Sequence, residues 1–333
     1  MVRFGVVGTG RISDWVLRGA AQEPRIKITA VCSRNEESAK AFIERNPLAS
    51  QAKTYTSVEE MAADPQVDAV YIGTPNQTHC DYTLACLSAG KHVLCEKPLA
   101  LNAEEGRKMI DAARSAGLLL MEAMVSTLNP NFTAAASRIS EIAPIRHYSS
   151  YFCQYSSKYE ALKRGEIASS FMPGTAGALR DIGVYTLYPM VALFGRPKSI
   201  SGDLQTINTH AGEADVCGSA HLKYDGMSAT LTWSKTYDSF QPTEIAGEGG
   251  NIILDEIHIA RKAEIIPHAA PTSGLGPKPG RNTISEGLPF NEYYYEFKEF
   301  ADLIEAGATE SKLNSHDTSL AVLEIMDMIL GLI

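Results

Sequence analysis

The chain has 333 residues, of which 44% are hydrophobic and 21% are charged, so it can bury a core without disulfides or structural metals. At roughly 100 to 200 residues per domain, this length predicts two domains. Lys and Arg number 30 against 39 Asp and Glu, which gives a net charge of -9. This balance excludes nucleic acid and anionic membranes as expected partners, because both need a broad basic surface.

The sequence also predicts no membrane span and favours a reducing compartment. The longest stretch without Asp, Glu, Lys or Arg runs for 15 residues, Ala123 to Ser137, whereas a bilayer needs about 20 apolar residues. The opening residues lack a signal-peptide pattern, so a cytoplasmic protein is expected. The six cysteines are widely spaced without a CxxC pair, which predicts buried, reduced thiols and no metal site.

The first 120 residues alternate between short apolar runs and longer helical patterns. This alternation predicts a doubly wound parallel sheet, and such a sheet binds ligands outside the carboxyl ends of its strands. The predicted strands are 3–7, 26–32, 69–72, 92–95 and 118–121, and the predicted helices are 12–22, 36–45, 79–89 and 103–116.

The pattern changes after about residue 124 to two-residue alternation, which indicates a mostly antiparallel sheet with accompanying helices. The fold class is therefore α/β, with a Rossmann domain at 1–123 and an α+β substrate-binding and oligomerisation domain at 124–333. Residues 267–289 hold five Pro and four Gly and are interpreted as a loop, either over a site or as a plain connection. The strands expected in the second domain are 146–156, 218–224, 227–236 and 251–261, and the helices are 178–194, 290–306 and 315–332.

A glycine-rich turn follows the first predicted strand. Gly8 permits a tight turn, Gly10 lets the backbone approach a pyrophosphate, and the helix that opens near Arg11 presents its amides to negative charge. An ordinary strand-to-helix turn is the alternative, but the surrounding alternation favours a dinucleotide site. The GxGxxS fingerprint consists of Gly8, Thr9, Gly10, Arg11, Ile12 and Ser13.

The second predicted strand ends at Cys32 and is followed by Ser33 and Arg34. NAD sites commonly carry an Asp or Glu here, which binds the ribose 2′-hydroxyl. A hydroxyl and a guanidinium instead suit a 2′-phosphate, so the sequence favours NADP and leaves NAD possible. The alternative is that Arg34 is a solvated loop residue.

Three further segments carry a resemblance to a known family: IGTPNQTH at 72–79, AGKHVLCEKPLA at 89–100 and GALRDIGVY at 177–185. With the glycine fingerprint, they make the chain similar to the glucose-fructose oxidoreductase, inositol dehydrogenase and MocA (Gfo/Idh/MocA) family over essentially its whole length. Tyr185 resembles the dimeric dihydrodiol dehydrogenase branch, because many sugar-oxidising members carry His there. The resemblance implies a cis Lys97–Pro98 bond and a cofactor groove lined by Thr74, Pro75, Asn76, His79, Glu96 and Lys97.

The resemblance also implies a catalytic set of Lys97, Asp181 and Tyr185. Lys97 follows a predicted strand, beside the expected cofactor crevice. Asp181 and Tyr185 are four residues apart at the start of a helical pattern, which predicts one shared face. A helix N-cap for Asp181 and a buried phenol for Tyr185 are the structural alternatives. In the hypothesis, Tyr185 is the candidate acid/base, Lys97 favours its phenolate and stabilises alkoxide, and Asp181 orients the substrate hydroxyl or the lysine. The sequence leaves open whether Lys97 or Tyr185 carries the proton.

The expected function is therefore an NAD(P)-dependent oxidoreductase, with NADP favoured, that acts on the CH–OH groups of a small sugar, polyol or dihydrodiol. A non-catalytic dinucleotide sensor that acts through a protein partner is the alternative, although a sensor has no need of all three catalytic residues. One face of the predicted antiparallel sheet needs cover, and in the family this face forms a subunit interface, so a homodimer or larger homo-oligomer is expected. Departures from the family pattern at 128–130 and 175–177 leave the substrate open.

Overall fold

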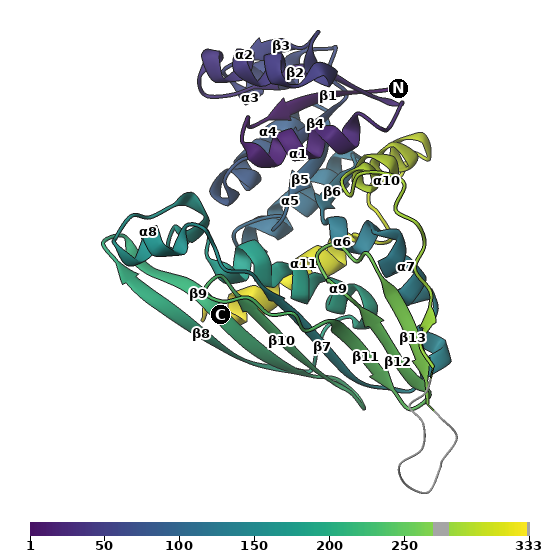
Figure 1. The fold of residues 1–333 in the computed structure, drawn as a ribbon. Coiled ribbons are helices and arrows are strands. Elements are labelled where there is room, and N and C mark those ends of the chain that lie inside the picture. Colours follow the sequence, from purple (N-terminus) through teal and green to yellow (C-terminus); the bar gives the residue numbers. More distant parts are fainter. Residues whose placement is uncertain (269–279, 332–333) are drawn as a thin grey trace, which may run out of the picture. The chain divides into compact units, whose positions relative to one another are not determined.

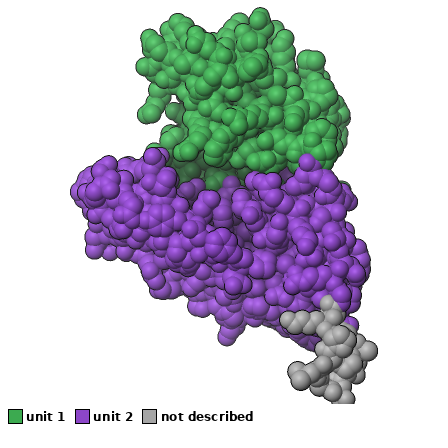
Figure 2. Space-filling model, in the orientation of Figure 1, with its two compact units in different colours: residues 1–125, 289–324 green, residues 126–288, 325–333 purple. Residues whose placement is uncertain are grey.

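The computed structural model describes residues 1–268 and 280–331 and divides into two compact units. Unit 1 comprises residues 1–125 and 289–324, and unit 2 comprises residues 126–288 and 325–333 (Figure 2). This division by compactness differs from the continuous domains expected at 1–123 and 124–333, because residues 289–324 group with the N-terminal part. The predicted loop at 267–289 lies partly outside the described residues.

The N-terminal part of unit 1 alternates strands and helices along the chain. Its elements are β1 (Val2–Val7), α1 (Arg11–Ala20), β2 (Ile26–Cys32), α2 (Glu36–Arg45), η1 (Pro47–Ala49), β3 (Lys53–Tyr55), α3 (Val58–Ala63), β4 (Ala69–Ile72), η2 (Asn76–Thr78), α4 (His79–Ser88), β5 (His92–Glu96), α5 (Ala103–Ala116) and β6 (Leu120–Ala123). The strands form one parallel sheet in the order β3-β2-β1-β4-β5-β6. All residues of β4 and β6 are buried, as expected for a parallel sheet with helices on both faces.

Two C-terminal helices, α10 (Tyr294–Glu305) and α11 (His316–Ile329), contribute to unit 1, and α11 continues into unit 2. Phe297 and Phe300 of α10 pack on Phe4 of β1, with ring centroids 5.4 and 5.2 Å apart. Gly19 of α1 allows the close approach of α10, because a Cβ there would lie 2.4 Å from the carbonyl carbon of Tyr293. Both helices were predicted, but their return to the N-terminal unit was not.

Unit 2 is built on one large sheet (Figure 1). Its elements, with α6 starting on the last residue of unit 1, are α6 (Val125–Leu128), α7 (Pro130–Ser137), η3 (Ile139–Ile142), β7 (Ile145–Cys153), α8 (Tyr159–Lys163), η4 (Ser169–Phe171), η5 (Leu179–Gly183), α9 (Val184–Phe194), β8 (Ser199–Thr209), β9 (Gly212–Lys223), β10 (Ser228–Ser234), β11 (Thr243–Gly247), β12 (Gly250–Leu254), β13 (Ala263–Pro267) and β14 (Asn282–Thr283). The sheet order is β14-β13-β12-β11-β7-β10-β9-β8, and all pairs are antiparallel except β7 with β10. This architecture confirms the predicted fold class.

The two faces of the large sheet differ in burial. On the face that carries η5 and α9, Trp233 of β10 is fully buried against Gly183. Strands β10, β11 and β12 alternate between buried and half-buried residues. The half-buried side chains of the other face, which include Ser149, Tyr151, Thr230 and Glu244, keep this face partly open within the chain.

Several elements depart from the sequence expectations. The strand expected at 251–261 ends at Leu254, because Oδ1 of Asp255 accepts hydrogen bonds from the amides of Glu256, Arg261 and Lys262 and turns the chain. Strands β3, β8, β11, β13 and β14 were not predicted, and β14 lies within the segment 267–289 that was interpreted as a loop. The six cysteines are buried and unpaired, as expected. Among the described residues, no helix is both long enough and apolar enough to cross a membrane.

Candidate active site

The glycine loop joins β1 to α1 in a conformation that requires Gly8. Its φ is +100°, and a Cβ there would lie 2.4 Å from the carbonyl oxygen of Gly73. The loop is fixed by two amides, since Gly8 donates to the carbonyl of Cys32 at 3.0 Å and Gly73 donates to that of Val7 at 2.8 Å. The backbone at Gly8 is therefore held against the end of β4.

Gly10 leaves the start of α1 open. It is the N-cap of the helix, contributes no side-chain hydrogen bond, and a Cβ there would meet no atom within 4 Å. In contrast, α2, α3 and α5 are capped by the side chains of Asn35, Ser57 and Asn102. The first amides of α1 are thus available to an anionic group, which fits the pyrophosphate of a dinucleotide.

The third position of the fingerprint packs the helix on the sheet. Ser13 is fully buried, and its Oγ would lie 2.8 Å from a Cβ at Gly73. Ile12 is half-buried beside it. A small residue is therefore required at 13, as the fingerprint implies.

The end of β2 meets the glycine loop. The hydroxyls of Thr9 and Ser33 lie 3.3 Å apart, and both residues are half-buried. Arg34 and Arg11 are exposed, and the Arg11 guanidinium lies 5.6 Å from the centroid of the Trp15 ring. The carboxyl ends of β1 and β2 therefore place two hydroxyls and two cations around one loop.

Arg45 is a residue of this region that sequence reasoning missed. It donates to the carbonyl oxygen of Thr9 at 2.8 Å and to Oδ1 of Asp14 at 2.9 Å. Asn46 donates to the same Asp14 oxygen at 2.8 Å. The C-terminus of α2 thus braces the glycine loop from outside, and no local sequence signal indicates it.

His79 ties two loops of the predicted groove together. Its ring is fully buried, with Nδ1 3.0 Å from the carbonyl oxygen of Pro98 and Nε2 2.9 Å from that of Thr74. Burial lowers the pKa of His79, and the hydrogen bonds to the Thr74 and Pro98 carbonyls act in the opposite direction. Thr74 and Asn76 are half-buried and Pro75 is exposed. This placement favours a positioning role for His79 over direct contact with a ligand.

Glu96 and Lys97 lie at the carboxyl end of β5. Tyr71 donates its hydroxyl to Oε1 of Glu96 at 2.9 Å, and the Lys97 amide donates to Oε2 at 3.2 Å. Lys97 is half-buried, and its bond to Pro98 is cis, as the resemblance implies. The backbone before Lys97 is therefore anchored to a buried carboxyl.

Two more buried carboxyl groups, those of Glu122 and Glu296, lie near Glu96. Burial raises the pKa of Glu122 to about 7, and Oε1 of Glu122 accepts the Leu99 amide at 3.0 Å. The pKa of Glu296 in α10 is raised well above its usual value, first by burial and then by the negative charges of Glu96 and Glu292. The buried surroundings of Glu122 and Glu296 therefore favour the protonated form of both carboxyls.

In unit 2, Gly177 starts the segment that carries Asp181 and Tyr185. Its φ is +123°, and a Cβ there would lie 1.5 Å from Oδ1 of Asp215. Asp215 accepts the Leu179 amide at 2.7 Å, so this buried carboxylate caps η5, a π-helical turn. Turns of this kind are rare in proteins overall, and those that occur are often found at functional sites.

Asp181 lies within η5 and Tyr185 at the start of α9, and both are half-buried. Oδ2 of Asp181 is 2.5 Å from Nζ of Lys235, a buried lysine that the sequence did not indicate. The structure therefore places Asp181 and Tyr185 on one helical segment, whereas Lys97 belongs to unit 1.

Two aromatic side chains flank Tyr185. Its ring contacts Phe152 edge to face, with centroids 5.5 Å apart, and lies 6.3 Å from His258 at a similar angle. Phe152 and His258 stack on each other at 4.4 Å. The sequence did not single out Phe152 or His258, because Phe152 lies on β7 and His258 on the loop after β12, both far from Tyr185 along the chain.

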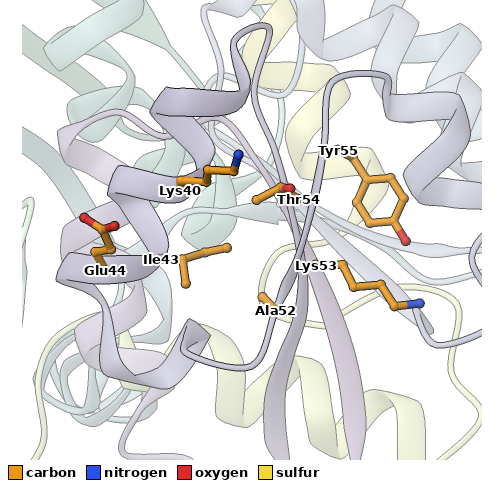
Figure 3. Close-up of a pocket in the computed structure, with 7 residues that line it drawn as sticks. All are labelled: Lys40, Ile43, Glu44, Ala52, Lys53, Thr54 and Tyr55. Carbon is orange, nitrogen blue, oxygen red and sulfur yellow. The ribbon is translucent and has the colours of Figure 1, made fainter.

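A separate surface groove of about 610 Å³ lies between α2 and the edge strand β3 (Figure 3). Lys40 is paired with Glu36 at 2.8 Å and Lys53 with Asp64 at 3.1 Å, so both cations are engaged. The groove contains none of the predicted site residues, since it is lined by Lys40, Ile43, Glu44, Ala52, Lys53, Thr54 and Tyr55.

Comparisons with known proteins agree with this geometry. A profile described as "Oxidoreductase family, NAD-binding Rossmann fold" matches residues 2–124, and one described as "GFO/IDH/MocA C-terminal domain" matches residues 136–253. A 3-ketoreductase from Actinomadura kijaniata, solved with TDP-benzene and NADP, has a TM-score of 0.80. The match covers 99% of this chain and 96% of that one at 23% identity, which shows a common fold.

Two curated relatives match nearly end to end. Scyllo-inositol 2-dehydrogenase (NADP(+)) of Bacillus subtilis is 37% identical over 331 residues, covering 98% of this chain and 95% of the relative. Trans-1,2-dihydrobenzene-1,2-diol dehydrogenase of Bos taurus is 29% identical over 318 residues, covering 93% and 90%. The predicted resemblance is therefore confirmed: the chain belongs to the Gfo/Idh/MocA family of oxidoreductases and is an enzyme that uses a nicotinamide dinucleotide.

Proposed function

We propose that the protein is an NADP-dependent dehydrogenase or reductase of a small cyclic polyol, sugar or dihydrodiol. The observation that carries the proposal is the presence in one chain of a glycine loop with an uncapped helix start together with Lys97, Asp181 and Tyr185. The relatives support the substrate class, because scyllo-inositol and trans-1,2-dihydrobenzene-1,2-diol are both rings with adjacent hydroxyls.

The preference for NADP rests on the end of β2. Ser33 and Arg34 supply a hydroxyl and an exposed guanidinium, which suit a 2′-phosphate. The hydroxyl contact between Thr9 and Ser33 supports this assignment, because it places Ser33 beside the glycine loop. The relative with the 37% identity is itself an NADP(+) enzyme by name.

The proposed mechanism separates hydride from proton transfer. A bound nicotinamide supplies hydride exchange at the substrate carbon, so the protein must exchange a proton at the substrate oxygen. Tyr185 is the proposed acid/base. A phenol has a pKa near 10 in water and is a poor base at neutral pH, and an ammonium beside it would favour the phenolate, the role that the family resemblance implies for Lys97. Asp181 is proposed to accept a hydrogen bond from a substrate hydroxyl and so orient the ring.

The test is a panel of sugars, inositols and dihydrodiols, assayed through the absorbance of reduced cofactor. Lys97→Met and Tyr185→Phe are expected to lower kcat/KM by roughly a hundredfold or more and to leave NADPH affinity nearly unchanged. Lys108→Met and Tyr155→Phe are matched controls, since both residues are exposed and make local contacts with Glu104 and Glu160. Full turnover in both active-site variants would refute the mechanism.

The panel also discriminates the sensor alternative. A sensor would bind NADPH tightly and turn over no compound, whereas an enzyme with Lys97, Asp181 and Tyr185 is expected to show activity with at least one cyclic polyol. The enzyme names of both relatives support the catalytic function over the sensor.

A homo-oligomer and a cytoplasmic location complete the proposal. The partly open face of the unit 2 sheet, with Tyr151 and Thr230 among its half-buried residues, is proposed as the subunit interface. Light scattering after gel filtration tests this, and Thr230→Arg is expected to shift the protein toward the monomer. Six buried, unpaired cysteines suit a reducing compartment, which cell fractionation tests.

A further inference from the structure

Lys235 is a buried lysine of unit 2 that the proposed mechanism does not use. It follows β10 and is only 5% exposed. Its Nζ lies 2.5 Å from Oδ2 of Asp181, donates to the carbonyl oxygen of Ser170 at 2.8 Å, and lies 4.4 Å from the centroid of the Phe171 ring. A carboxylate, a carbonyl and an aromatic face therefore surround this ammonium group.

The surroundings of Lys235 are suited to a positive charge. Moving an ammonium out of water is unfavourable unless good partners replace the lost hydration. Ser170 and Phe171 belong to η4, and Phe171 is fully buried in a small core with Leu162 and Val216. The segment between β7 and η5 that carries η4 therefore holds the Ser170 carbonyl and the Phe171 ring in fixed positions beside the lysine.

Stability alone does not explain this arrangement. Replacing a buried ion pair with apolar side chains often leaves a protein equally stable or more stable. The partner of Lys235 is also not buried, because the Asp181 side chain is 38% exposed. A lysine fixed on three sides thus holds a carboxylate that solutes can reach.

Other charges lie near this ion pair. Asp215 caps η5, and burial raises its pKa, an effect that the Leu179 amide and the positive charges of Arg180 and Lys235 only partly offset. Lys235 therefore faces two carboxylates, with Asp181 in direct contact. Arg180 is the second cation of the group and is buried within η5.

We propose that Lys235 is a positioning residue that keeps Asp181 ionised and fixes its carboxylate so that it can accept a hydrogen bond from a substrate hydroxyl. This inference rests on the role given to Asp181 in the proposed function. Lys235 acts through Asp181 and needs no contact with the substrate. Its ammonium group extends the ionised range of that carboxylate to lower pH.

The test uses Lys235→Gln, which keeps a donor for the Ser170 carbonyl and removes the charge. The assay follows reduction by NADPH of the ketone derived from the most active compound of the panel. In this direction Tyr185 must be protonated and its ionisation gives the alkaline limb, so the acid limb reports Asp181. We expect kcat/KM at pH 7 to fall at least tenfold while the affinity for NADPH, measured by fluorescence, stays within about twofold. Without the cation the acid limb of the pH profile should move up by about one unit, because a nearby positive charge favours the ionised form of Asp181.

Three further variants make the result specific. Lys235→Arg keeps the charge and should restore the acid limb to its original position. Lys198→Gln is the matched control, since this exposed lysine of unit 2 pairs with Asp225 at the surface and should leave the profile unchanged. In an Asp181→Asn background, Lys235→Gln should cause no additional loss of kcat/KM.

The outcomes separate the two proposals. No turnover of any panel compound by the wild-type protein would overturn the proposed function, whereas full activity of Asp181→Asn would overturn the role of Asp181 and with it the inference on Lys235. An impaired Asp181→Asn together with an unshifted acid limb in Lys235→Gln would overturn only the inference on Lys235. If Lys235→Gln does not fold, it is replaced by the double variant Lys235→Met in the Asp181→Asn background, which removes both charges. A kcat/KM below that of Asp181→Asn alone would then contradict the inference.

Discussion

The Gly177→Ala substitution tests how the segment of Asp181 and Tyr185 is held. At a φ of +123°, an Ala is strained by about 1–2 kcal/mol. Its Cβ would also lie 1.5 Å from Oδ1 of Asp215, so the carboxylate must move away from the Leu179 amide that it accepts at 2.7 Å. Losing this charge-assisted hydrogen bond adds roughly 1.5–3 kcal/mol, for a total destabilisation of about 2.5–5 kcal/mol.

Gly174→Ala is the matched control, because Gly174 also has a positive φ, +75°, and a Cβ there would meet no atom within 4 Å. It should suffer the backbone strain alone. The excess of Gly177→Ala over this control is therefore about 1.5–3 kcal/mol, or roughly 3–12 °C in Tm for a unit of this size. Differential scanning calorimetry of both variants measures the difference.

The same calorimetry can isolate the carboxylate. In an Asp215→Ala background the clash is absent, so Gly177→Ala should fall to the level of the Gly174→Ala control. Equal Tm losses for Gly177→Ala and Gly174→Ala in the wild-type background would refute the argument, because they would mean that Asp215 does not hold η5.

Three further predictions concern the cofactor and the buried carboxyls. Arg34→Ala should weaken NADP binding about ten- to a hundredfold and leave NAD binding nearly unchanged, with exposed Arg164→Ala as control; equal losses for both cofactors would contradict the specificity argument. Gly10→Ser should raise the Tm of the cofactor-free protein and shrink the further rise on adding NADP; an undiminished rise would count against a phosphate at α1. The Glu122 carboxyl has its pKa raised from 4.5 to about 7, so its contribution to stability is complete below about pH 4.5 and is lost as the pH rises to 7, by about 3 kcal/mol. Glu122→Gln should therefore flatten urea-unfolding stability over this range, and an unchanged slope would refute the assignment.

Local patterns made the first half of the fold predictable. Gly8 and Gly10 act within a few residues, and the apolar runs of β4 and β5 are bounded by turn residues, so each could be recognised in its own segment. Strand β8 could not, because Ser199–Thr209 is mostly exposed on both faces and shows no alternation of hydrophobic side chains. Strand β3 has only three residues, which is too few for a period.

The supporting residues of the site were hidden for a different reason. Lys235 and Asp215 are distant from Asp181 along the chain and approach it through pairing of β9 with β10, where the Lys235 amide donates to the carbonyl of Val216. A charged residue directly after the strand SATLTWS was the available signal, but such a lysine is usually solvated. Arg45 likewise reaches Thr9 only through the packing of α2.

The start of α1 shows why one residue can weaken a helix and still serve the protein. Asn or Ser at position 10 could cap the helix, as Asn35, Ser57 and Asn102 do elsewhere in unit 1, and such a cap is worth a few tenths of a kcal/mol relative to Gly. Gly10 gives up that contribution in the cofactor-free protein, because it has no side chain to accept the amides. A bound phosphate oxygen can accept them instead, so the helix gains its missing hydrogen bonds together with the ligand. The hydrogen bonds that the helix start lacks in the cofactor-free protein therefore contribute to cofactor binding. Cofactor should stabilise this end of unit 1 more than it would stabilise a helix that caps itself.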